Sequence, residues 1–178
     1  MDAAVVLPVS FEGQMGGTFF YEYEDNHLSV SMGREAWGYP KAYAKCDMIQ
    51  TEKGVRARVW DYETNVFSVD VTFCDTVDDG AWADVQLYPQ LQTRFATQLA
   101  GPGFSLLEVV SRDPSVDYVA KQRFVGRAEV EIGRLDLTNR ILDGGGFEIK
   151  EVLGAELRIG DYRSTPENGV PKVVRKLV

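Results

Sequence analysis

Two neighbouring segments of the chain alternate apolar and polar residues with a period of two, and this pattern constrains the fold more than any other. Residues 55–60 place an apolar side chain at every second position, and residues 66–73 repeat the alternation after a short polar turn. Successive side chains of a β-strand point to opposite faces of the sheet. The pattern therefore predicts strands that bury one face and expose the other.

Apolar segments with strand-like patterns recur along most of the chain. We predict further strands at residues 18–23, 28–32, 82–87, 105–110, 118–124, 128–132 and 147–159. Turn sequences rich in glycine, aspartate, asparagine and proline separate them. The sequence Glu24-Asp25-Asn26 predicts a hairpin that joins the strands at 18–23 and 28–32.

Helix signals are weak by comparison. Residues 90–98 could form two helical turns after Pro89, and residues 135–142 could form a short helix that ends at a run of glycines. The sequence shows no repeat, low-complexity segment or linker, and 178 residues suit one domain over residues 1–178. Many short strands with regular turns predict a mostly β fold, either a sandwich, a barrel or a barrel-like arrangement.

The net charge of −8 argues against partners that need a basic surface. An acidic surface repels the phosphates of nucleic acids and anionic lipids, so we expect neither nucleic acid nor membrane as a partner. No apolar segment reaches the roughly 20 residues that a membrane-spanning helix needs. The N-terminus also lacks the basic stretch of a secretory signal, so we expect a cytoplasmic protein.

The chain has a single histidine, His27, which limits the possible mechanisms. A histidine-rich metal site is impossible, and a Ser-His-Asp or Cys-His arrangement would have to use a residue that follows a turn and is expected to be solvated. Cys46 and Cys74 lack paired spacing and are expected to be free thiols. We expect no metal and no cofactor, so acid–base chemistry falls to carboxylates, tyrosines or lysines.

The segment from Gly33 to Lys41, GREAWGYPK, is the most informative part of the sequence for chemistry. It follows a predicted strand and is expected to begin as a loop. Gly38 permits backbone angles closed to other residues, and Pro40 fixes its own φ and holds Tyr39 in an extended conformation. The lysine is therefore expected to leave a stiff loop in a defined direction.

Lys41 becomes a nucleophile only if its amine is neutral. With an ordinary pKa near 10.4, about one lysine in a few thousand is neutral at pH 7. Burial among Trp37, Tyr39 and Tyr43 would disfavour the charged form and lower the lysine pKa. A neutral amine can attack a ketone to give an iminium, which accepts the electrons of a breaking bond. On residue types alone, a solvated surface lysine is the commoner outcome.

The residues of this segment resemble the acetoacetate decarboxylase superfamily. The resemblance rests on the run Leu7-Pro8-Val9-Ser10-Phe11 and on the later Gly33-Arg34-Glu35-x-x-Gly38-Tyr39-Pro40-Lys41. It implies a mostly antiparallel β domain with a cone-like barrel and few short helices. It also implies that Lys41 is the Schiff-base residue, since in that family the lysine after a Tyr-Pro or Phe-Pro pair has this role.

Three departures from the family pattern bear on function. Typical acetoacetate decarboxylases have a second lysine where this chain has Ala42. Relatives carry an additional N-terminal portion that supplies an active-site arginine. Asp2 has the spacing of a catalytic glutamate of the relatives, but terminal residues are usually mobile.

The remaining candidate residues have structural alternatives. Glu35 could handle protons near the iminium or make structural hydrogen bonds, and Arg34 could bind substrate or brace the loop. Trp37 and Tyr39 are expected to form the wall of the substrate site.

We predict a Schiff-base lyase that decarboxylates a small keto acid, without a metal or cofactor. An aldolase-dehydratase or cyclase that uses the same lysine is the first alternative, which Ala42 favours. A ligand-binding or assembly protein without catalytic activity is the second. We also expect a homo-oligomer, because exposed strand edges and apolar surface would be covered by another subunit.

Overall fold

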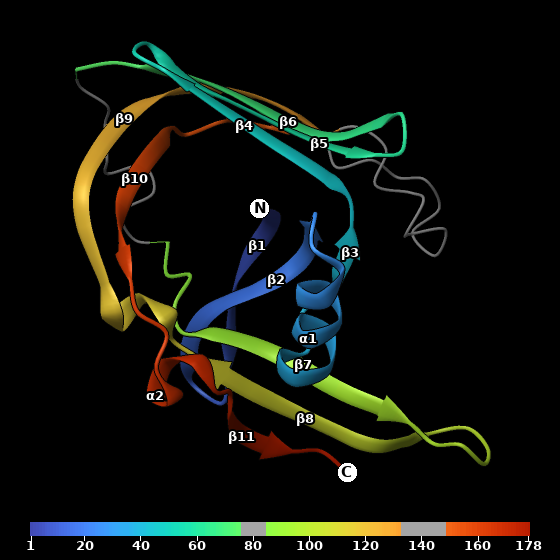
Figure 1. Cartoon of the computed structure of the whole chain (residues 1–178). Coiled ribbons are helices and arrows are strands. Elements are labelled where there is room, and N and C mark those ends of the chain that lie inside the picture. The colour runs from blue at the N-terminus through green and yellow to red at the C-terminus, as the bar shows by residue number, and fades with distance from the viewer. Residues whose placement is uncertain (76–84, 133–148) are drawn as a thin grey trace. The chain divides into compact units, whose positions relative to one another are not determined.

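The computed structural model describes residues 1–75, 85–132 and 149–178 (Figure 1). Strands dominate these residues and helices are few and short, so the prediction of a mostly β fold is confirmed. Backbone contacts group the chain into two compact units that are both discontinuous in sequence. The first unit contains Met1, Tyr43–Asp84 and Ala120–Gly160, and the second contains Asp2–Ala42, Val85–Val119 and Asp161–Val178. A single domain over residues 1–178 stays a prediction.

The first unit contains a five-stranded sheet in the order β10-β9-β6-β5-β4. Its strands are β4 (Lys45–Thr51), β5 (Gly54–Asp61), β6 (Thr64–Phe73), β9 (Tyr118–Ile132) and β10 (Ala155–Tyr162), the last two for most of their length. The pairs β4–β5, β5–β6 and β6–β9 are antiparallel. The strands predicted at 55–60 and 66–73 are confirmed, and those predicted at 118–124 and 128–132 are one continuous strand.

The second unit contains a six-stranded sheet in the order β1-β2-β7-β8-β11, with β3 also paired to β2 (Figure 1). Its strands are β1 (Asp2–Phe11), β2 (Gln14–Glu24), β3 (Lys41–Tyr43), β7 (Gln90–Thr97), β8 (Phe104–Arg112) and β11 (Lys172–Lys176). The 3-10 helix η2 (Pro114–Asp117) and the short helix α2 (Pro166–Gly169) belong to the same unit.

The antiparallel pairing of β1 with β2 contains a β-bulge. Val6 lies opposite Phe19 and Val5 lies opposite Tyr21, so Phe20 is the extra residue of β2. Beyond the bulge the pairing continues until Asp2 lies opposite Glu24. A bulge of this kind locally changes which side chains share a face of the sheet.

The predicted hairpin between residues 18–23 and 28–32 is wrong, because residues 28–32 lie in helix α1 (His27–Trp37). Asn26 caps the helix, since its side chain accepts a hydrogen bond of 3.1 Å from the backbone N–H of Ser29. Gly38 ends the helix with a φ of 72°, the left-handed conformation that glycine adopts readily. Apolar alternation over five residues predicted a strand, but the segment forms a helix that is capped at both ends. The segment expected to begin as a loop at Gly33 is therefore helical as far as Trp37.

Four other predicted elements also need correction or fall outside the described residues. The helix predicted at 90–98 is wrong: this segment is strand β7, in which β-formers such as Phe95 pair with β8. The described part of the strand predicted at 82–87 forms no strand, and the one predicted at 147–159 begins only at Ala155. The helix predicted at 135–142 lies outside the described residues. Among the described residues, no helix has both the length and the apolar character needed to cross a membrane.

The interior of the second unit contains ionisable side chains beside its apolar ones. Glu22, Glu24, Lys41 and Glu108 are all buried, although charged side chains rarely are. A buried charge is tolerated when it is paired and hydrogen-bonded. Three of these four residues meet at one place, which is the candidate site described next.

Candidate active site

Lys41 is the first residue of β3 and follows α1 after a three-residue connection. The residue is only 5% exposed. Its aliphatic stem passes directly over Gly33 of α1: a Cβ atom built on Gly33 would lie 2.5 Å from Lys41 Cδ and 2.6 Å from Cε. The helix therefore leaves room for the lysine only because residue 33 has no side chain.

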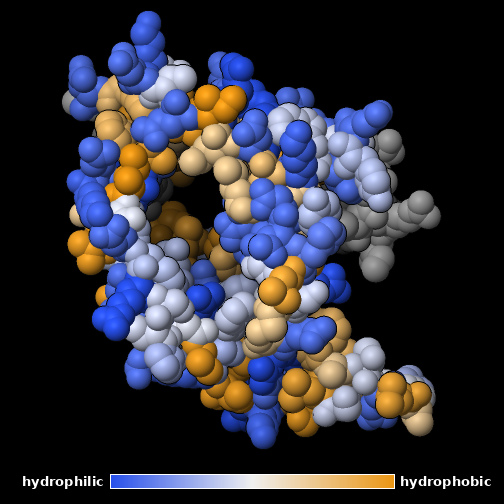
Figure 2. Space-filling model, in the orientation of Figure 1, coloured by the Kyte–Doolittle hydropathy of each residue, from blue (hydrophilic) through white to orange (hydrophobic). Residues whose placement is uncertain are grey.

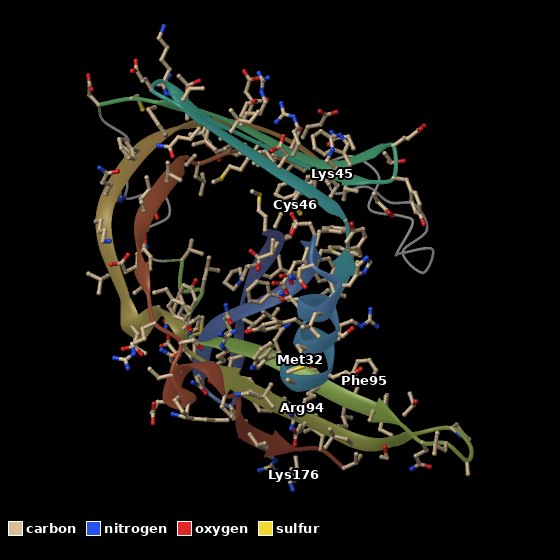
Figure 3. All side chains as sticks on the ribbon, in the orientation of Figure 1. Met32, Lys45, Cys46, Arg94, Phe95 and Lys176 are labelled. Atoms are coloured by element: carbon tan, nitrogen blue, oxygen red, sulfur yellow. The ribbon has the colours of Figure 1, made fainter. Side chains whose placement is uncertain are left out.

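The connection that carries Lys41 is fixed from several sides. Arg34 donates a hydrogen bond of 3.2 Å to the backbone carbonyl of Lys41. Arg94 of β7 donates to the carbonyl of Ala36 near the C-terminal end of α1, at 3.0 Å, and is itself held by buried Glu108 at 2.8 Å (Figure 3). These contacts hold the end of the helix, and so the start of β3, against the sheet.

Three carboxylates surround the amine of Lys41. Its Nζ lies 2.5 Å from Glu24 Oε2, 3.2 Å from Glu22 Oε1 and 3.9 Å from Asp2 Oδ2. Glu22 and Glu24 are two residues apart on β2, so they point to the same face. Asp2 reaches the site because β1 places it opposite Glu24. Its side chain is 59% exposed, whereas the two glutamates are buried.

The pKa values of the central pair shift because of this arrangement. Burial raises the pKa of Glu22 from its ordinary value of 4.5 to about 7, although the charge of Lys41 opposes the shift. Burial lowers the pKa of Lys41, but the hydrogen bond to Glu24 and the charges of both glutamates outweigh it. The net effect raises the pKa of Lys41. The expected fall in this pKa is therefore wrong, because the expectation took account of aromatic neighbours and not of carboxylates.

Aromatic side chains cover one side of the amine. The ring centroid of Tyr39 lies 5.9 Å from Lys41 Nζ, and Phe19 packs against Tyr39 at 4.8 Å between ring centroids. Trp37 stacks on the ring of Tyr39 at 6.0 Å. Tyr43, which we also expected to shield Lys41, is 48% exposed.

A hydrogen-bond network fixes the orientation of Tyr39. Its hydroxyl donates to Gln90 Oε1 and accepts a hydrogen bond of 3.1 Å from Arg112 Nη1. The guanidinium of Arg112 also stacks on Trp37, with 5.0 Å from Cζ to the ring centroid. Trp37 Nε1 in turn donates to the carbonyl of Gly169 at 2.9 Å. The wall of the site is thus rigidly supported.

The structure brings some of the predicted site residues together at the lysine and leaves Glu35 away from it. Lys41, Tyr39 and Trp37 come together, and Arg34 braces the backbone of the lysine. Glu35 is exposed on α1, and among the described residues the carboxylates that contact the lysine amine are those of Glu22, Glu24 and Asp2.

Glu22 and Glu24 were missed by the sequence analysis. The sequence showed two acids at alternate positions of an aromatic strand, which is also the pattern of a solvent-facing side.

The described residues offer no alternative site of metal chemistry. They contain no group of three or more histidine, cysteine, aspartate or glutamate side chains placed to hold a metal ion. His27 is exposed at the start of α1, and Cys46 and Cys74 form no disulfide. Cys46 is buried and Cys74 is half-buried.

Comparisons with known proteins find relatives that are similar in sequence and in fold. The curated acetoacetate decarboxylase of Burkholderia cenocepacia (strain HI2424) is 44% identical over 43 residues, which are 24% of this chain and 18% of the relative. The crystal structure of acetoacetate decarboxylase from Legionella pneumophila matches with a TM-score of 0.79 and 19% identity, over 99% of this chain and 67% of that chain. This match confirms the predicted fold.

A second structural match is to an enzyme with a different description. The enduracididine biosynthesis enzyme MppR, complexed with the condensation product of pyruvate and imidazole 4-carboxaldehyde, matches with a TM-score of 0.64 and 15% identity, over 90% of this chain and 61% of that chain. The family model described as acetoacetate decarboxylase (ADC) matches residues 1–171. Because this match spans nearly the whole sequence, the chain belongs to the acetoacetate decarboxylase family.

Proposed function

We propose that this chain forms a Schiff base between Lys41 and a small keto acid and releases carbon dioxide from the adduct. The observation that supports the proposal most directly is the buried amine itself. Lys41 stands at the end of the family motif, is 5% exposed, and has two buried carboxylates within 3.2 Å of Nζ. A lysine held in this way is oriented and can exchange protons, which are the two requirements of a Schiff-base residue.

The proposed reaction begins with the neutral amine, which attacks the ketone carbon of the substrate. The carbinolamine that forms loses water and becomes an iminium. In a β-keto acid the bond to the carboxylate then breaks, its electrons move into the iminium, and carbon dioxide leaves an enamine. Protonation of the enamine carbon and hydrolysis release the ketone and restore Lys41.

The surroundings of Lys41 suit the cationic stages of this sequence. The iminium keeps a positive charge on the nitrogen, beside Glu24 and Glu22, and fixed negative charges in a buried site stabilise a cation strongly. The ring of Tyr39 lies on the same amine and limits the access of water. The same carboxylates also stabilise the resting ammonium, so the site must move a proton before it can react.

Two other functions have support of their own. Ala42 in place of a second lysine, together with the match to MppR, favours an aldolase-dehydratase that uses the same iminium. The raised pKa of Lys41 favours a binding protein, because an ammonium held by carboxylates does not attack a ketone. These alternatives share the fold and the site, and differ in what the amine does.

The three functions can be separated by trapping and product analysis. The protein is incubated with acetoacetate or with pyruvate, reduced with borohydride, and mapped by mass spectrometry, while carbon dioxide release is measured in parallel. Lys41→Arg is the matched variant, since it keeps a cation beside the glutamates but cannot form an iminium. The exposed lysines Lys45 and Lys53 are internal controls in the same digest.

We expect a borohydride-stable adduct on Lys41, carbon dioxide release from acetoacetate, and loss of both in Lys41→Arg. An adduct without carbon dioxide would replace the decarboxylase by the aldolase-dehydratase. An adduct confined to Lys45 or Lys53, or no adduct with either ketone, would overturn the Schiff-base function.

A further inference from the structure

One oxygen atom in the site has no hydrogen-bond partner among the described residues. Glu22 is 3% exposed, and its Oε1 lies 3.2 Å from Lys41 Nζ, but its buried Oε2 accepts no hydrogen bond. A carboxylate oxygen buried in this way has lost its hydration without compensation, which disfavours the charged form of the group. A proton on Glu22 removes that penalty.

The neighbouring carboxylates do not share this condition. Glu24 accepts the hydrogen bond of the lysine at 2.5 Å, and the side chain of Asp2 is 59% exposed to water. Among these three carboxylates, Glu22 is therefore the one with a buried oxygen that no hydrogen bond compensates. The rise of its pKa to about 7, which burial causes, agrees with the geometry.

We propose that Glu22 is a catalytic residue that takes a proton from the Lys41 ammonium and returns it during formation of the iminium. The proposal rests on the Schiff-base function proposed above. Glu22 contacts the reacting nitrogen directly, and a group that is partly protonated at neutral pH can act both as a base and as an acid.

The proton balance of the proposed steps closes within the pair. The Lys41 ammonium gives one proton to the Glu22 carboxylate, and both groups become neutral. The free amine adds to the ketone, and its second proton passes to the carbonyl oxygen to give the carbinolamine. The Glu22 acid then protonates the hydroxyl, which leaves as water. The products are an iminium, one water molecule and the Glu22 carboxylate, so Glu22 ends as it began.

Several ionisable groups face Glu22, and each affects the balance. Lys41 on β3 favours its ionised form, while Glu24 on the same strand and Asp2 on β1 favour its protonated form. The phenol of Tyr39 also interacts with Glu22, across the same interior.

The test compares two glutamine variants that differ only in which carboxylate is removed. Glu22→Gln keeps the size of the side chain and cannot exchange a proton, and Glu24→Gln is the matched control beside the same amine. The rate of iminium formation is followed by borohydride trapping in single turnovers from pH 5 to pH 9. Carbon-13 NMR of protein labelled at the glutamate carboxyls follows the titration of Glu22 directly. Circular dichroism and thermal unfolding confirm that each variant is folded.

In the wild type we expect one glutamate to titrate near pH 7 and a change of slope in the rate at the same pH. In Glu22→Gln the NMR titration and the change of slope disappear, and the rate at pH 7 falls roughly 100-fold, within the usual range for a general acid–base group. Glu24→Gln keeps a glutamate titration and a change of slope, both moved to a lower pH because the charge of Glu24 no longer raises the pKa of Glu22. If Glu22→Gln does not fold, Glu22→Asp retains the acid at a greater distance, and we expect a slower rate that keeps the pH dependence.

The outcomes separate this proposal from the proposed function. A wild type that forms no iminium with any ketone overturns the Schiff-base function and the catalytic role of Glu22 together. An active wild type whose rate and pH profile survive in Glu22→Gln overturns the role of Glu22 alone. A wild type in which no glutamate titrates near pH 7 also overturns it.

Discussion

Replacing Glu24 by glutamine tests whether carboxylates control the charge of Lys41. The substitution removes a negative charge 2.5 Å from Nζ but keeps an oxygen that can accept its hydrogen bond. At that distance the Coulomb attraction between unit charges is about 1.7 kcal/mol with the dielectric constant of water and about 7 kcal/mol with an effective value of 20. At 1.36 kcal/mol per pKa unit, these limits correspond to a fall of about one to five units in the pKa of Lys41.

Even the smaller of these two changes in the pKa of Lys41 is easily measured. We expect the pKa of Lys41 to lie above that of exposed lysines in the wild type and to fall by at least about one unit in Glu24→Gln, which makes the neutral amine roughly tenfold more abundant at pH 7. Competitive acetylation at a series of pH values, read by peptide mapping, reports each lysine separately. Lys45 and Lys53 are exposed and should not change.

Two results would refute the electrostatic account of the site. A wild-type Lys41 that titrates below Lys45 and Lys53 would show that desolvation outweighs the carboxylates, as the sequence alone suggested. A pKa of Lys41 that is unchanged or higher in Glu24→Gln would show that Glu24 does not hold the ammonium.

Three further substitutions test the packing of the second unit. Gly33→Ala adds a methyl group where Lys41 passes, so we expect borohydride trapping to fall roughly tenfold or more. We also expect thermal unfolding at a lower temperature, because a displaced Lys41 leaves the buried glutamates without their counter-ion. Tyr39→Phe leaves its buried glutamine acceptor without a donor and should lower the free energy of unfolding in urea by about 1–3 kcal/mol. We expect self-association through the apolar surface of the β7–β8 hairpin, where Phe95 is 61% exposed (Figure 2). Light scattering should show that Phe95→Asp weakens association and that the control Tyr62→Asp, at a residue 96% exposed in the first unit, does not; a wild type that is monomeric would contradict this expectation.

The parts of the fold that the sequence predicted are those in which one pattern dominates. Strands β5 and β6 alternate apolar and polar residues over most of their length, and this pattern located both strands without help from the rest of the chain. Lys41 was found for a different reason, because the motif around it has a fixed spacing and resembles a family. Its burial then confirmed part of the expected environment.

Helix α1 was missed because its signals are at its ends. Leu28, Val30 and Met32 alternate like a strand, and the helix buries only Gly33, so no apolar stripe marks its inner face. The caps at Asn26 and Gly38 were present in the sequence, with eleven residues between them. A reading that began from these caps would have found the helix.

The anionic lining of the site could not be predicted from local sequence. Glu22 and Glu24 look like ordinary acids on a solvent-facing side of a strand. Only the placement of β3 against β2 turns that side toward Lys41 and makes the two glutamates its counter-ions. Such contacts join residues that are 17 or more positions apart, and side-chain type alone does not determine them.

The bulge in β2 affects which side chains of this strand lie on the side of Lys41. Phe19 packs on Tyr39, and Glu22 contacts Lys41. These two residues are three positions apart, so in a regular strand they would point to opposite faces of the sheet. The extra residue Phe20 reverses the alternation, so that the aromatic cover and the acidic lining lie on one side. Deletion of Phe20 would leave a regular strand in which Phe19 and both glutamates still share a face. If the bulge were lost while Phe20 stayed, the alternation would instead turn both glutamates away and leave Lys41 without their charges, although every residue of the lysine motif would be unchanged. In this chain, regular pairing through Phe20 would alter the electrostatics of the site as thoroughly as replacement of its acids.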